Sequence, residues 1–243
     1  PLLPLAQIES GGFHLVGTTS IGKTTALNLA ASVAGLKTIP SWRSTSNALE
    51  GKAAEFNHML LPLDEIGQAD PQTVGASAYM LGNGQGKNRM IKMLSTVKPK
   101  TWELLFLSTG EVSMTDYLRQ AKIPAKGGME ARMPSIPADA GKGYGVFENL
   151  HGYKTSDEFV AALETAIRKH QGTAQDAYLT ELVEAHKVEE FERELRERVH
   201  AIASKLSQQF KDTAISRVAI RFALVQVGLE LAHSFGLLPF PIE

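Results

Sequence analysis

The chain has 243 residues, of which 43% are hydrophobic and 21% are charged, as in ordinary soluble globular proteins. Its formal net charge of −1 excludes a uniformly basic surface, so any surface for nucleic acid must be local. The absence of cysteine excludes disulfides, thiol catalysis and cysteine–zinc sites. Without a membrane-length apolar run, a cytoplasmic location and no membrane partner are expected. The first residue is not Met, which suggests a piece of a longer polypeptide.

The first half of the chain alternates apolar strands with helices. Strands are expected at residues 13–16, 58–65 and 101–111, and helices at 23–34, 48–57 and 71–83. Asn47 and Glu50 have the spacing of a capping box, and Asp70 before a proline is a strong helix start. His14 alternates within the first strand and is expected to be a core or semi-buried histidine. Pro62 lies inside the second strand, which is unusual for a central strand.

The second half begins with a change in composition. Residues 122–145 are dense in glycine and proline, which predicts a loop region with short strands. After Ser156 the pattern becomes helical, with apolar residues every three or four positions from Val188 to Phe210 and again from Val218 to Leu229. We therefore expect an α/β core over residues 1–150 and a helical part over residues 151–243.

One short stretch points to nucleotide chemistry. Residues 17–24 have the spacing G-x-x-x-x-G-K-T, directly after the first strand and before the first core helix. Glycines in such a loop let backbone N–H groups turn toward phosphate oxygens, and the helix N-terminus adds positive potential. Lys23 can reach the β- and γ-phosphates, and Thr24 can offer its hydroxyl to Mg²⁺. The nucleotide-binding residues expected here are Gly17, Thr18, Thr19, Ser20, Ile21, Gly22, Lys23, Thr24 and Thr25.

Polar residues at two other strand ends complete the predicted site. Asp64 can bind the water shell of Mg²⁺, and Glu65 can polarise an attacking water. This pair favours ATP hydrolysis over phosphate transfer to a metabolite, which leaves a small-molecule kinase as the weaker interpretation. Ser108 or Thr109, at the end of the third strand, could sense the γ-phosphate, or both could cap the next helix. ATP and Mg²⁺ are the expected cofactors.

An ordered set of motifs is familiar. "GFHLVGTTSIGKTTAL", "LLPLDEIGQ", "YMLGNGQGKNRM", "LFLSTGE", "IPAD" and "SRVAIRFALVQVGLELA" together resemble the domain-of-unknown-function family nine-two-seven, over nearly the whole chain. Such domains often end primase-like proteins of plasmids, phages and genomic islands. They are similar to AAA+ motors of the minichromosome-maintenance class, which form rings and unwind DNA.

The resemblance implies a fold and an activity. The fold is an α/β P-loop NTPase, with an AAA+-like parallel sheet core and a C-terminal helical lid. The activity is that of an ATP-driven helicase or translocase used in replication of a mobile genetic element. Its partners would be single-stranded or forked DNA, further copies in a homo-oligomeric ring such as a hexamer, and a primase domain in the same polypeptide.

The resemblance also implies roles for two arginines. Arg132 falls where an arginine finger could reach the γ-phosphate of a neighbouring subunit. Arg217 resembles the second sensor arginine of the lid helix, with Arg221 as the runner-up. The guanidinium is always charged and offers a planar fork of donors, which suits both tasks. The alternative is that Arg132 and Arg217 are ordinary surface arginines.

Residues 87–100 form the densest cluster of one charge sign. They contain no acid, and they lie where related helicase motors insert a hairpin that contacts DNA. The expected DNA-binding residues are Lys87, Arg89, Lys92, Lys98 and Lys100. A solvated basic face is the alternative. A non-motor ATP-dependent switch or DNA-binding assembly module is the second function class, and stimulation of ATP turnover by single-stranded DNA would separate it from a motor.

Overall fold

The computed structural model describes residues 1–87, 89–90, 96–124, 128–208, 210 and 212–240. Its centre is a parallel sheet of four strands in the order β2-β5-β1-β6. The strands are β1 (Gly11–Val16), β2 (Leu60–Leu63), β5 (Leu105–Gly110) and β6 (Ser135–Pro137). All three neighbouring pairs run parallel, so the carboxyl ends of the strands meet at one edge of the sheet.

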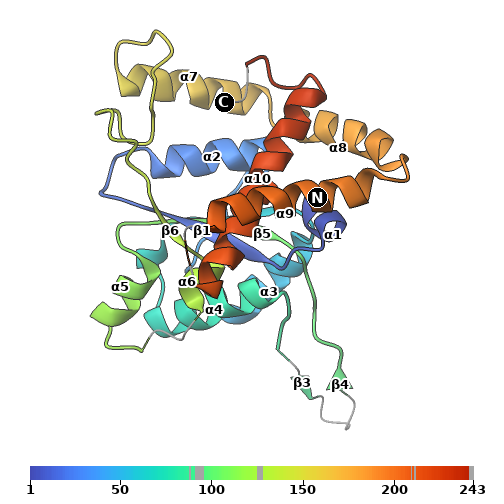
Figure 1. Cartoon of the computed structure of the whole chain (residues 1–243). Helices are drawn as coiled ribbons and strands as arrows, with labels where there is room; N and C mark the ends of the chain where they lie inside the picture. The colour runs from blue at the N-terminus through green and yellow to red at the C-terminus, as the bar shows by residue number, and fades with distance from the viewer. Residues whose placement is uncertain (88, 91–95, 125–127, 209, 211, 241–243) are drawn as a thin grey trace.

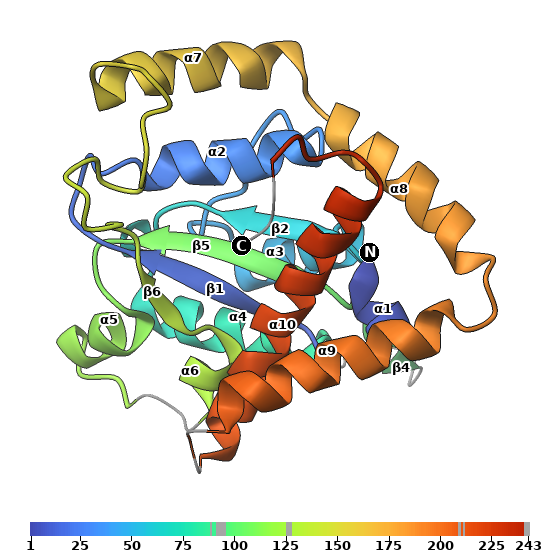
Figure 2. The same ribbon diagram turned by 45° about the horizontal axis from the view of Figure 1, so that its top comes forward.

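Helices cover both faces of the sheet, as parallel strands require. One face carries α2 (Lys23–Val33), and the other carries α3 (Ser46–Glu55) and α4 (Pro71–Asn83), as Figure 2 shows. A further helix, α7 (Ser156–Lys169), lies outside α2. The main apolar core lies between the sheet and α3 and α4, and it contains fully buried large side chains such as Trp42 and Phe106.

A second apolar cluster joins the two ends of the chain. The helices α8 (Thr173–His186), α9 (Phe191–Ser207) and α10 (Thr213–Ser234) follow α7. The N-terminal α1 (Leu2–Ala6) packs against α9 and α10, so the cluster combines N-terminal with C-terminal residues. No helix in the described part of the chain has the length and apolarity needed to cross a membrane.

Short elements connect these layers. A 3₁₀ turn, η1 (Ile66–Gln68), precedes α4, and α5 (Met114–Gln120) follows β5. One-turn α6 (Met129–Arg132) leads into β6. The sequence predicts a loop region with short strands at residues 122–145, so β6 is as expected, whereas the helical turn α6 is not.

A two-stranded hairpin projects from the body between α4 and β5, at the place that the resemblance to helicase motors implies (Figure 1). Its antiparallel strands are β3 (Arg89–Met90) and β4 (Thr96–Val97). At its stem, the N–H of Gly86 donates to the carbonyl of Lys100 over 2.8 Å. The indole of Trp102 donates to the carbonyl of Leu81 over 3.1 Å, which fastens the stem to the last turn of α4.

The structure corrects the predicted cap of α3 and explains the proline within β2. The cap of α3 is Thr45, whose hydroxyl accepts from the N–H of Ala48 over 3.3 Å, so the capping box predicted from Asn47 is wrong. Glu50, its expected second member, is buried. Pro62 is tolerated because β2 is the outermost strand of the four-stranded sheet, where the missing N–H breaks no ladder.

Candidate functional site

The loop between β1 and α2 closes around the ammonium of Lys23. Ser20 (φ 63°) and Gly22 (φ 95°) both have left-handed backbones, which bend the loop back toward the start of α2. The Nζ of Lys23 donates to the carbonyls of Gly17 over 2.8 Å and Thr18 over 2.7 Å, and only 7% of the residue is exposed. Two carbonyls of the loop therefore hold the Lys23 ammonium at the N-terminus of α2, the positive end of the helix dipole.

A cavity of about 550 Å³ opens beside this loop, and we call it the loop cavity. Its volume is in the usual range for small-molecule sites. Its lining comprises Thr19, Ser20, Ile21, Gly22, Lys23, Thr24, Thr25, Glu65, Glu111, Gly143, Tyr144, Gly145, Phe147, Ser156, Asp157 and Val160. One wall is fastened to the loop itself, because the N–H of Val146 donates to the carbonyl of Ile21 over 2.9 Å.

Thr109 holds the carboxylate of Asp64 and the backbone of Glu65, the two acidic residues that follow β2. Its hydroxyl donates to Oδ1 of Asp64 over 2.8 Å and accepts from the backbone N–H of Glu65 over 3.0 Å. Glu65 has an unusual backbone for a non-glycine residue (φ 44°), and its Oε1 accepts from the N–H of Gly67 over 3.1 Å. Strained backbones of this kind cluster at functional sites and need support from their surroundings. Here Thr109 provides that support and turns Glu65 toward the loop cavity.

Asp64 lies beside the loop cavity rather than in its wall. It lines a smaller neighbouring hollow, together with Asn28, Lys37 and Glu164. Its carboxylate is thus held by Thr109 at the carboxyl end of β2, one residue before Glu65.

Ser108 belongs to a buried chain of hydrogen bonds behind the site. The indole of Trp42 donates to its hydroxyl over 2.8 Å, and the hydroxyl lies 2.9 Å from Nδ1 of His14. The carbonyl of Val112, 3.0 Å from Nε2 of His14, can only accept, so Nε2 carries the hydrogen and Ser108 donates to Nδ1. Burial lowers the pKa of His14; the hydrogen bond to the carbonyl of Val112 opposes this lowering, and the charge of Lys23 adds to it. Ser108 is fully buried, and its hydroxyl does not reach the loop cavity.

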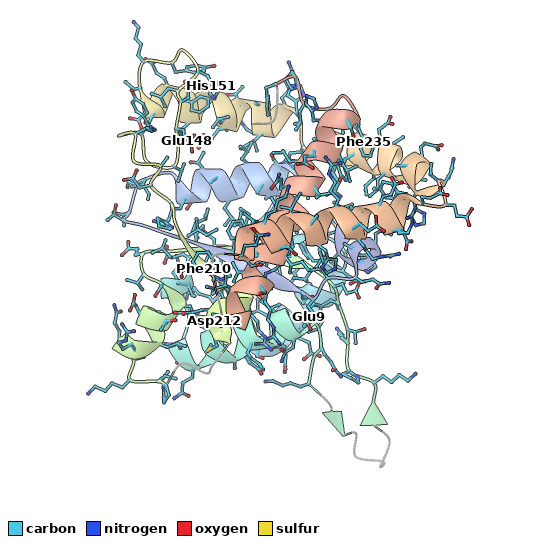
Figure 3. The ribbon with its side chains drawn as sticks, in the orientation of Figure 1. Glu9, Glu148, His151, Phe210, Asp212 and Phe235 are labelled. Atoms are coloured by element: carbon cyan, nitrogen blue, oxygen red, sulfur yellow. The ribbon has the colours of Figure 1, made fainter. Side chains whose placement is uncertain are left out.

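Arg132 and Arg217 lie together in another hollow, of about 770 Å³, which we call the arginine hollow. Other parts of its wall are Glu9, His58 and Glu103, which precede β1, β2 and β5. The hollow is therefore at the amino ends of the strands, whereas the loop cavity is at their carboxyl ends. Strand β1 (Gly11–Val16) separates the two levels by about 20 Å at the usual rise per residue. Figure 3 shows Glu9 well apart from Glu148 and His151, which come shortly after the cavity-wall residue Phe147 in the sequence.

Arg221 has a structural role in this region. Only 3% of it is exposed, and its Nη2 donates to the carbonyl of Ala131, next to Arg132. Its pKa is lowered to about 10, mainly by burial; the charge of Glu9 opposes this lowering, and the charges of Arg132 and Arg217 add to it. The buried guanidinium fixes the backbone of α6, so it is not placed to meet a ligand as the runner-up sensor would be.

The predicted DNA-binding residues divide into two groups. Lys87, Lys98 and Lys100 are exposed on the hairpin arms. Lys92 lies outside the described residues, and so does the side chain of Arg89. The described arms thus present lysines away from the loop cavity.

Comparison with known proteins bears on these features. Residues 1–100 match the family model described as Domain of unknown function (DUF927). The resemblance to DUF927 is thereby confirmed over these residues. No curated protein matches the chain.

The solved structure titled "SCCmec type IV Cch - active helicase" is similar to 97% of this chain, with a TM-score of 0.70 and 21% identity. The likeness shows that the two share a fold. The match covers 41% of that helicase, so this chain spans about two fifths of its length.

The DUF927 match includes part of the candidate site. It contains the loop, Asp64, Glu65 and the hairpin arm up to Lys100, whereas Glu111, Arg132 and Arg217 lie beyond it. Glu111 in the wall of the loop cavity was not predicted, although a carboxylate directly after a buried strand is a signal that could have found it. Tyr144 and Asp157 were also missed, and the sequence holds no comparable signal for them. Among the described residues, no group of three or more His, Cys, Asp or Glu could hold a metal by itself.

Proposed function

We propose that this chain is the ATP-hydrolysing core of a ring-forming DNA helicase or translocase of a mobile genetic element. The observation that carries the proposal is the loop cavity, whose wall contains both Lys23, held by two loop carbonyls, and the acidic residue Glu65. This is the combination needed to bind a nucleoside triphosphate and to activate water beside it.

The chain's own groups fit ATP and Mg²⁺. In the structure, the Lys23 ammonium contacts two loop carbonyls, and phosphate oxygens would take the place of these acceptors. The hydroxyl of Thr24, in the wall of the loop cavity, would hold Mg²⁺ together with phosphate oxygens, and the carboxylate of Asp64, beside the cavity, would hold the water shell of the ion. The ion would neutralise charge on the transferred phosphoryl group. Few direct protein ligands are needed because Mg²⁺ keeps several waters.

Glu65 is the proposed general base. It lies in the cavity wall, and its backbone is held by Thr109, so Thr109 acts as a positioning residue. The strand order supports an additional-strand ATPase of AAA+ type, because β5 lies between the strand of the loop and the strand of Asp64. Of the two polar residues at the tip of β5, Thr109 is the one that contacts both carboxylate-bearing residues, and we assign no phosphate contact to Ser108.

In a ring of subunits, the two arginines could contact a nucleotide bound by a neighbouring chain. Arg132 and Arg217 lie at the edge of the sheet opposite to their own loop. We infer that they serve the nucleotide of an adjacent subunit, with Arg132 as the finger and Arg217 as the sensor. An arginine finger contributes about three to five decades in rate, so an isolated chain should hydrolyse ATP slowly.

The hairpin supplies the proposed contact to DNA. In a ring of subunits, the contributions of its exposed lysines to DNA affinity would add up, because each contact with a phosphate releases counterions. Such contacts read the backbone and no base sequence. The solved helicase named for SCCmec type IV supports this proposal through its shared fold.

A mixing experiment tests the shared site. Lys23→Ala protein cannot use its own loop, and Arg132→Ala protein cannot supply a finger. A mixture should regain ATP turnover, because a mixed interface joins an intact loop to an intact finger. Absence of rescue at every mixing ratio, in rings verified by sizing, would contradict the trans role of Arg132.

A further inference from the structure

The last turns of α4 form a seat for the side chain of Arg132. The guanidinium carbon lies 4.4 Å from the ring centroid of Tyr79, within the range of a cation–π contact. Its Nε donates to Oδ1 of Asn83 over 2.9 Å, and its Nη1 donates to the carbonyl of Gly128 over 3.1 Å. Among the described residues, Nη2 has no hydrogen-bond partner. One face, Nε and Nη1 of the guanidinium are thus held within the chain, and Nη2 remains available to an anion.

Gly82 makes this seat possible. It lies between Tyr79 and Asn83 in α4, at the spacing that brings the three positions to one face of the helix. A Cβ at Gly82 would be 2.8 Å from Cδ of Arg132 and 3.0 Å from its Cβ and Cγ. These atoms are near the root of the side chain, so a methyl group here would displace Arg132 itself.

The backbone that carries Arg132 is fixed from the other side. Arg221 of α10 donates to the carbonyl of Ala131, and it is buried against Gly11 at the start of β1. Both the root and the head of Arg132 are therefore located by elements of the core, although α6 has only one turn.

We propose that Tyr79, Gly82 and Asn83 are positioning residues that present Arg132 to the nucleotide of the adjacent subunit. The proposal rests on the proposed function, since it presumes that Arg132 acts in trans. An arginine is flexible, and a misplacement of about 1 Å at a reacting centre can cost about a hundredfold in rate. A seat made by a rigid helix fixes the donor fork before the subunits meet, so less freedom is lost when the phosphate is contacted.

The decisive variant is Gly82→Ala, and Gly75→Ala is its matched control. Both place a methyl group in the same helix, where alanine is the better helix former. At Gly75, the new Cβ would meet only the flexible tips of Met129 (3.3 Å) and Leu118 (3.4 Å). We expect Gly82→Ala to lower the kcat for ATP about a hundredfold, with ATP affinity unchanged. Gly75→Ala should keep the parent kcat.

The mixing assay isolates the presentation of Arg132 from folding. The acceptor is Arg132→Ala protein, with an intact loop. The donors are Lys23→Ala alone, Lys23→Ala with Gly75→Ala, and Lys23→Ala with Gly82→Ala. The first two donors should rescue turnover, and the third should not. Thermal unfolding and ring size, measured on all three, identify a donor that fails for structural reasons.

A second pair of variants covers the case in which Gly82→Ala fails to fold. Tyr79→Leu removes the aromatic face and should lower rescue about tenfold, which corresponds to the upper range of a cation–π contact. Tyr79→Phe keeps that face and should rescue like the parent donor.

Equal rescue by the Gly82→Ala and Gly75→Ala donors would contradict the positioning role of the seat, and so would equal rescue by Tyr79→Leu and Tyr79→Phe. Neither result would contradict the trans role of Arg132. If the Lys23→Ala donor alone gives no rescue, the trans role of Arg132 in the proposed function is wrong, and the positioning proposal, which rests on it, is wrong too.

Discussion

Removal of the Thr109 hydroxyl should damage stability and turnover together. Thr109→Val preserves the shape of the side chain but removes both the donor to Asp64 (2.8 Å) and the acceptor for the Glu65 N–H (3.0 Å). A hydrogen bond to a charged group contributes about 1.5–3 kcal/mol, and a buried N–H without a partner costs about 1–3 kcal/mol. Because Asp64 and Glu65 are half-buried, water can replace part of each loss. We expect the free energy of unfolding to fall by about 2–4 kcal/mol.

The effect on catalysis follows from the backbone of Glu65. Without its hydrogen bond to Thr109, the strained conformation at φ 44° loses its support, and the carboxylate moves from its position in the loop cavity. Turnover at saturating ATP should fall about a hundredfold, while ATP binding through the loop remains. The assays are denaturant unfolding, equilibrium ATP binding and steady-state hydrolysis.

Thr109→Ser is the control, since it retains the hydroxyl and loses only a methyl group. It should stay near the parent in both stability and turnover. Parent-like turnover by Thr109→Val would refute the idea that this hydroxyl positions Glu65.

Two further predictions concern the hairpin and the buried histidine. Lys98→Ala combined with Lys100→Ala should weaken DNA binding equally for all sequences and reduce the salt slope by about one per lost phosphate contact, leaving basal ATP hydrolysis unchanged; an unaltered slope in a filter-binding or anisotropy titration counts against the hairpin as the DNA contact. His14 has a lowered pKa in the fold, so below about pH 6.5 the unfolded chain binds a proton that the folded chain does not. Stability should therefore decline as the pH falls below about 6.5, by up to about 1.4 kcal/mol per pH unit. His14→Gln should flatten that decline in denaturant unfolding, and an identical slope in both proteins would contradict this origin.

The sequence predicted the parts of the site that are continuous along the chain. A loop between a strand and a helix depends on local glycine geometry and helix start signals, so residues 17–24 are found where expected. The same holds for the start of α4 at Asp70, whose carboxylate accepts from the N–H of Thr73. The hairpin was expected at the basic segment from the resemblance to helicase motors, because a one-sign cluster by itself gives no strand register.

Features that depend on tertiary contacts could not be predicted. The sequence left Ser108 and Thr109 as equivalent candidates, and only the packing shows that Ser108 bonds Trp42 and His14 whereas Thr109 bonds Asp64. These bonds join residues more than forty positions apart, for which no periodic pattern exists.

The apolar pattern of α10 shows a second limit. The sequence showed a stripe through Val218, Phe222, Val225 and Leu229, as expected for a buried face. In the structure Phe222, Val225 and Leu229 are between two fifths and one half exposed, and the buried positions are Ala219, Ala223, Leu224 and Val227. Hydrophobic spacing identifies the helix, but it does not identify which of two apolar faces the rest of the chain covers.

The most direct test of the proposed motor is the rate of ATP hydrolysis with and without single-stranded DNA, measured on the parent, Glu65→Gln and Lys23→Ala. We predict that the parent hydrolyses ATP and is stimulated by DNA. Glu65→Gln should bind ATP but not turn it over, and Lys23→Ala should not bind. Hydrolysis that DNA leaves unchanged would contradict the motor and favour the ATP-dependent switch, and parent-like turnover by Glu65→Gln would contradict the assignment of the base.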